Sequence, residues 1–79
     1  MTRAVIKLSN DIGRAMPRLS LQIEGCAYNP EAGLLAFPFH NMAVTVEPHR
    51  INIYNIEDET MVKTFIDWFK SIVNNRPIK

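Results

Sequence analysis

The side chains that could do chemistry in this 79-residue chain are few and lie far apart in the sequence. The single cysteine is Cys26, and the two histidines are His40 and His49. A reactive thiol needs a neighbouring base and an electropositive setting, and a zinc or iron–sulfur site needs several ligands. No CxxC, HxH or HxxE spacing accompanies these residues. We therefore expect Cys26 to pack as a small apolar side chain, with a reactive or ligating role as the alternative.

The remaining polar candidates have simpler structural explanations. His40 and His49 flank one predicted strand at its opposite ends, so we expect both in surface turns rather than on one metal ion. The acidic run 57–59 could bind a cation, but acidic residues also stabilise a helix N-terminus, and Asp58 can cap it. The chain contains no G-x-G-x-x-G, no P-loop and no nucleophile elbow. We expect a non-enzymatic protein without a cofactor or metal site.

Composition limits the class of protein and its partners. The net charge is +1, and lysines and arginines are scattered along the chain. This weighs against nucleic acid and anionic membranes, which both require a concentrated basic face. No apolar stretch approaches the ~20 residues that span a bilayer, and the N-terminus lacks the apolar run of a signal peptide. One cysteine allows no internal disulfide, so we expect a cytoplasmic protein. The length of 79 residues predicts a single domain over residues 1–79.

Residues 1–24 are predicted to be helical. Apolar residues recur there at spacings of three and four, at Val5, Leu8, Ile12, Met16, Leu19 and Ile23. We expect a break at residues 9–11 and a kink at Pro17, which cannot donate a backbone hydrogen bond. In the alternative interpretation, residues 4–8 form a strand, because Ala4, Ile6 and Leu8 also alternate with period two.

Residues 25–56 change to period two and predict an antiparallel meander of three to four strands. The expected strands cover residues 26–29, 34–39, 42–47 and 50–56. Pro30 and Gly33 are typical of the first connecting turn. Residues 40–41 and 48–49 supply the next two turns.

Residues 57–75 predict a C-terminal amphipathic helix. Its apolar stripe consists of Met61, Val62, Phe65, Ile66, Phe69, Ile72 and Val73. Asn74, Asn75 and Pro77 are expected to end it. The resulting fold class is α+β, a two-layer sandwich in which the meander is covered on one face by the kinked N-terminal helix and the C-terminal helix.

Three stretches of the chain carry a resemblance: LSNDIGRAMPRLSLQIEGCAYNPEAGLLAF, VTVEPHRINI and EDETMVKTFIDWFKSIVN. Over about residues 4–74 the chain resembles a segment of iron–sulfur proteins of anaerobes. In those proteins the segment precedes a four-cysteine cluster domain of the type found in the corrinoid iron–sulfur subunit of the acetyl-CoA pathway. The cluster cysteines of that family lie downstream of the segment, and none can be carried over to this chain. The resemblance implies an accessory domain whose partner is an iron–sulfur or corrinoid protein.

Function is therefore expected to reside in a surface. The second face of the sheet would carry small or weakly polar side chains, at Ala36, Ala43, Thr45, Asn52 and Tyr54, and Trp68 is a further candidate anchor. We expect a binding or adaptor domain that docks to a protein partner or forms a homodimer. One alternative is iron or iron–sulfur handling with Cys26 shared between subunits. Another is nucleic-acid binding through stacking on Tyr28 and Tyr54, against which the near-neutral charge argues.

Overall fold

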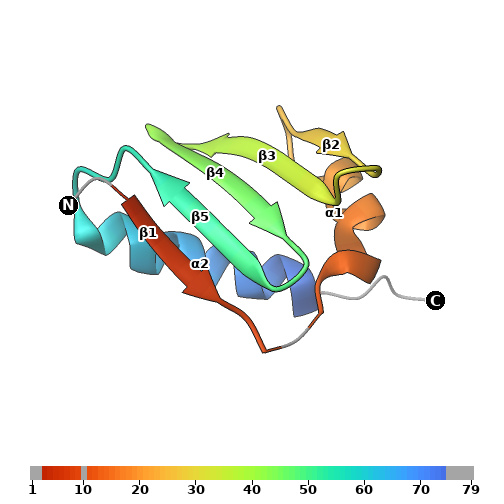
Figure 1. The fold of residues 1–79 in the computed structure, drawn as a ribbon. Helices are drawn as coiled ribbons and strands as arrows, with labels where there is room; N and C mark the ends of the chain where they lie inside the picture. Colours follow the sequence, from red (N-terminus) through yellow and green to blue (C-terminus); the bar gives the residue numbers. More distant parts are fainter. Residues whose placement is uncertain (1–2, 10, 75–79) are drawn as a thin grey trace.

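The computed structural model describes residues 3–9 and 11–74, which form an α+β sandwich of a five-stranded antiparallel sheet and a helical layer (Figure 1). The elements in chain order are β1 (Arg3–Lys7), η1 (Gly13–Ala15), α1 (Met16–Gln22), β2 (Ala27–Asn29), β3 (Leu34–Phe39), β4 (Met42–Glu47), β5 (Arg50–Tyr54) and α2 (Glu59–Asn74). The strand order is β1-β5-β4-β3-β2. The predicted fold class is confirmed, with one strand more than the predicted three to four.

The additional strand is β1, so the prediction that residues 1–24 are helical is wrong at Arg3–Lys7. This stretch pairs antiparallel with β5, with Arg3 opposite Tyr54 and Lys7 opposite Arg50. Its side chains alternate between the two faces of the sheet, and this period of two fits the segment as well as the helical spacing does. The partner strand lies more than forty positions away, so a local pattern cannot reveal the pairing. Tertiary pairing with β5 thus favours the strand of the alternative interpretation.

Residues 13–22 are helical, as predicted, but the backbone is extended at Ile23, so the helix ends before the predicted residue 24. A short 3₁₀ turn, η1, leads directly into α1, and the helical geometry changes just before Pro17. Pro17 lies in the first turn of α1, where its missing N–H would have had no partner in the helix. Asp11 Oδ1 accepts a 2.7 Å hydrogen bond from the Gly13 N–H, so the predicted break is an Asx turn. Asn10, which belongs to the predicted break, lies outside the described residues.

The β2–β3 hairpin has the turn that its sequence predicts. Asn29 Oδ1 accepts hydrogen bonds from the backbone N–H groups of Glu31 and Ala32, at 3.0 and 3.2 Å. Gly33 follows with φ of 64°, the left-handed conformation that glycine adopts without steric cost. The next turn is less usual, because His40 has φ of 56° and carries a side chain.

The β4–β5 turn also positions the N-terminal segment. The Leu8 N–H donates to the His49 carbonyl at 2.7 Å, and the Ile12 N–H donates to the Pro48 carbonyl at 2.9 Å. These two bonds satisfy carbonyl groups of the turn and lead the chain from β1 into η1. Arg18 of α1 then donates to the carbonyls of Ile72 and Val73, so α1 contacts the end of α2.

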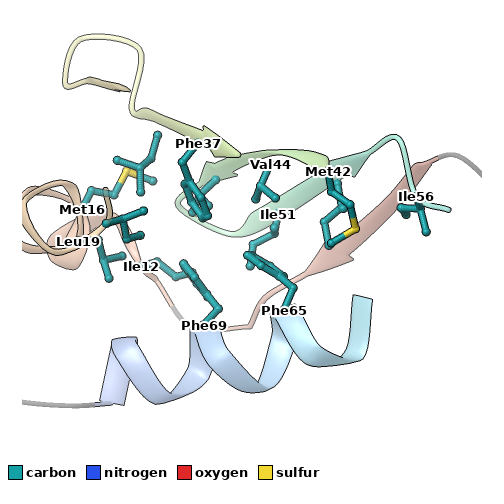
Figure 2. Close-up of a cluster of buried hydrophobic side chains, with 14 residues drawn as sticks. Ile12, Met16, Leu19, Phe37, Met42, Val44, Ile51, Ile56, Phe65 and Phe69 are labelled. Carbon is teal, nitrogen blue, oxygen red and sulfur yellow. The ribbon is translucent and has the colours of Figure 1, made fainter. Parts of the chain in front are cut away.

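Helix α2 lies across one face of the sheet (Figures 1 and 2). Its N-terminus is capped by Asp58, whose Oδ1 accepts a 3.0 Å hydrogen bond from the Thr60 N–H. This bond lowers the pKa of the Asp58 carboxyl. The helix ends at Asn74, and the predicted terminating residues Asn75 and Pro77 lie outside the described residues. No helix in residues 3–9 and 11–74 is long and apolar enough to cross a membrane.

The core lies between α2 and the sheet (Figure 2). Its buried hydrophobic residues are Ile12, Met16, Leu19, Ile23, Leu35, Phe37, Met42, Val44, Val46, Ile51, Ile53, Ile56, Phe65 and Phe69. Phe65 is fully buried and stacks on Phe69, with 5.5 Å between ring centroids. It also meets the edge of Phe39 at 5.3 Å. This ring therefore joins α2 to β3.

Replacing Phe65 by alanine should unfold most of the protein. A buried phenylalanine truncation costs about 3–5 kcal/mol, close to the whole stability of a small domain. Circular dichroism during urea titration measures the effect. Leu21→Ala is the control, because Leu21 is 88% exposed and its loss should change stability by less than about 0.5 kcal/mol. A Phe65→Ala protein with an unchanged urea midpoint would contradict this core.

The Asp58 cap should make stability depend on acid pH. Because the folded pKa lies below the unfolded value of 3.8, the carboxylate stabilises the fold above that value and loses this contribution as the pH falls through the folded pKa. Asp58→Ala should therefore lower the melting temperature near neutral pH, and the difference from the native protein should shrink in strong acid. Asp58→Asn, which keeps an oxygen acceptor without a charge, is the matched control. An equal effect of Asp58→Ala at both pH values would refute the assignment.

Candidate interaction surface on the open face of the sheet

No element of the described residues covers the sheet face opposite α2, and we call this face the open face (Figure 1). Strand register places five of the predicted surface residues on it. Ala36 lies opposite Thr45, which lies opposite Asn52, and in the next row Ala43 lies opposite Tyr54. Because cross-strand partners point to the same side of a sheet, these five side chains share one face.

Asn52 lies at the centre of a hydrogen-bonded group on the open face. Its Nδ2 donates to Thr45 Oγ1 at 3.2 Å and to Glu47 Oε2 at 3.0 Å. Asn52 is only 7% exposed, although no helix or strand among the described residues lies over it. The other oxygen of the Glu47 carboxylate lies 3.6 Å from Arg50 Nη2. This network fixes the polar side chains of β4 and β5 in place, which the sequence pattern did not predict.

The β1 side of the open face is basic. The Arg3 guanidinium carbon lies 5.4 Å from the centre of the Tyr54 ring, a cation–π contact. Val5, in the middle of β1, is 44% exposed. Lys7 is exposed at the far end of the strand. Tyr54 is therefore engaged with a cation of its own chain.

The other side of the open face carries small uncharged residues, and Ala36, Pro38 and Ala43 line a shallow hollow of about 400 Å³. Ala27 is the cross-strand partner of Ala36, and Pro38 is the partner of Ala43. We call these four residues the alanine patch. Ala27, Pro38 and Ala43 are exposed and Ala36 is half-buried. A patch without charges has a low cost of desolvation when another surface covers it.

Trp68 lies in the other layer of the sandwich. Its ring is 5.9 Å from the ring of Phe37 and 5.0 Å from that of Phe39, both on the sheet face that α2 covers. The structure therefore does not bring Trp68 together with the five open-face residues. Trp68 instead widens the apolar side of α2 toward β3.

Cys26 packs at the edge of the hydrophobic core. The residue is half-buried against the core cluster, and burial raises the pKa of its thiol. A raised pKa lowers the fraction of thiolate, the nucleophilic and metal-binding form. The geometry agrees with the expected packing role.

The histidines lie in turns at opposite ends of β4, as predicted. The structure places His40 beside the acidic run, since His40, Glu57 and Asp58 line one small hollow of about 260 Å³. The sequence does not reveal that His40 lies near the acidic run, because this proximity depends on the path of the chain from β5 into α2. Within residues 3–9 and 11–74, no three His, Cys, Asp or Glu side chains are grouped closely enough to hold a metal ion.

The two tyrosines considered for base stacking lie on opposite faces. Tyr28 pairs with Leu35 and packs against the core, whereas Tyr54 pairs with Ala43 on the open face. They cannot form one stacking platform.

Comparison with known proteins adds no relative: no family model, no curated protein and no solved structure matches the chain. The iron–sulfur or corrinoid partner implied by the resemblance stays a prediction.

The Cys26 thiol should react slowly in the folded protein. Because its pKa is raised, alkylation by iodoacetamide should show a pH midpoint above that of the urea-unfolded chain, and a lower rate at neutral pH. Mass spectrometry of the two time courses gives both quantities. Faster alkylation of the folded protein would show that Cys26 has an activating environment and would overturn the packing role.

Proposed function

We propose that this chain is a non-enzymatic protein-binding domain that acts through its open face, and that a second copy of the chain is one occupant of that face. The observation that carries the proposal is the gathering of the alanine patch on the β2, β3 and β4 side of the open face, which no described element covers. Short side chains let two sheets approach closely, and their lack of charge removes the repulsion that like residues would otherwise feel across a two-fold axis.

The polar residues beside the patch favour the same arrangement. Glu47 and Arg50 offer opposite charges on the open face, so a two-fold partner can meet each charge with its opposite. The Asn52 amide nitrogen already donates to two acceptors of its own chain. A partner that covers this amide therefore leaves both of its N–H donors bonded. Burial of this face would also add apolar contacts to a core limited by the size of the domain.

Ala36→Glu should abolish self-association. The substitution places a carboxylate in the patch, and a two-fold axis brings it near its own copy, where both charges lose water. Sedimentation equilibrium at tens of micromolar should give the mass of a dimer for the native chain and of a monomer for the variant. Circular dichroism checks that the variant folds.

Thr64→Glu is the matched control, because Thr64 is exposed on α2 and the change in charge is the same. It should leave the dimer intact. A native chain that stays monomeric at these concentrations, or a Thr64→Glu variant that dissociates equally, would refute self-association through the open face.

A further inference from the structure

A groove runs along the other edge of the sandwich, between β1 and the C-terminal half of α2. Its volume is about 520 Å³. The apolar side chains that line it are Ile6, Leu8, Ile12, Ile66, Phe69 and Val73. All six belong to the core or pack against it, so the groove opens directly onto the hydrophobic interior.

The groove follows from the unequal flanks of α2. On the flank toward β3, Trp68 reaches Phe37 and Phe39 and fills the space between helix and sheet. On the flank toward β1, Ile66 and Val73 are shorter and leave space beside the end strand. A sixth strand placed next to β1 would cover this flank, because its inward side chains would lie above it.

The backbone of β1 can accept such a strand. β1 is the end strand of the sheet, and within the described parts of the chain it pairs with β5 alone. The peptide groups on its outer edge therefore have no strand partner there. Extended segments of other proteins commonly bind at edges of this kind, where backbone bonds give affinity and a neighbouring groove selects side chains.

The charges at this edge select the partner. Arg3 and Lys7 lie on β1, and Lys70 lies beside the groove on α2. The described residues that line the groove include Lys7 and Lys70 and no carboxylate. In an antiparallel pair of two β1 strands centred on Val5, Arg3 of one copy would face Lys7 of the other, and like charges directly opposite destabilise a pair. A second copy is thus disfavoured, and an acidic strand is favoured.

We propose that β1 and this groove bind an extended segment of a partner protein in which acidic residues alternate with apolar ones. The apolar side chains enter the groove beside Ile66 and Val73, and the acidic side chains point to the opposite side, where Arg3 and Lys7 lie. The alternation follows from the period of two along any strand that pairs with β1. The site does not depend on the proposed self-association, because the alanine patch lies on the other half of the sheet.

Fluorescence anisotropy with labelled synthetic peptides tests the proposal on the full chain. The probe is a nine-residue peptide of alternating glutamate and valine. The comparison peptides replace glutamate by lysine, scramble the order at constant composition, or carry N-methyl groups that prevent backbone pairing on one edge. We expect saturable binding of the alternating acidic peptide and weaker binding of the lysine and scrambled peptides. Two N-methylated peptides are used, one methylated at the odd and one at the even positions, and at least one of them should bind more weakly.

Charge reversal identifies the site. Arg3→Glu combined with Lys7→Glu should weaken binding of the acidic peptide by about tenfold or more, since the two cations on the face that receives the acidic side chains become anions. Lys63→Glu combined with Thr64→Glu is the control, because both residues are exposed on α2 and neither lines the groove. It should retain most of the affinity.

Three results would overturn the proposal. The first is equal binding of the scrambled and alternating peptides, which would show attraction by charge alone. The second is an equal loss in both double variants. The third is the absence of saturable binding of the alternating acidic peptide. Dissociation of a native dimer by the Arg3 and Lys7 substitutions would in that case show that this edge is an interface between copies of the chain.

Discussion

Contact between the apolar side of α2 and one face of the sheet is the constraint from which the other surfaces of this domain follow. Phe65 is fully buried at that contact, between Phe69 of its own helix and Phe39 of β3. One helix has enough apolar surface to cover one face, so the opposite face stays open to solvent. The same contact leaves a groove at β1, because the bulky Trp68 lies on the β3 flank.

The elements built from local signals could be predicted from the sequence. The hairpin strands β3 and β4 have the predicted bounds, and the turn after Asn29 has the predicted glycine conformation at Gly33. These features depend on neighbours within a few positions. The strand β1 could not be predicted in the same way, because Val5 and Ile6 fit both periods and the pairing with β5 that decides between them is distant in sequence.

Part of the candidate surface could be predicted, because it also depends on local alternation along the strands. Alternation along β3, β4 and β5 placed Ala36, Ala43 and Thr45 on one side without knowledge of the helix. Two features needed the assembled sheet. The bonds from Asn52 to Thr45 and Glu47 join β5 to β4. The groove is lined by residues of both β1 and α2, so it exists only once these two elements lie side by side. Trp68 was grouped with the surface because its helical position alone does not show which neighbouring strand it meets.

The account holds that binding resides in the sheet, away from any reactive side chain. Backbone amide chemical shifts, recorded from dilute to concentrated protein, test this most directly because they report each residue separately. The account predicts concentration-dependent shifts in the sheet strands β2 to β5, largest around Ala27, Ala36 and Ala43. Shifts confined to the solvent side of α2, or no change at any concentration, would contradict it.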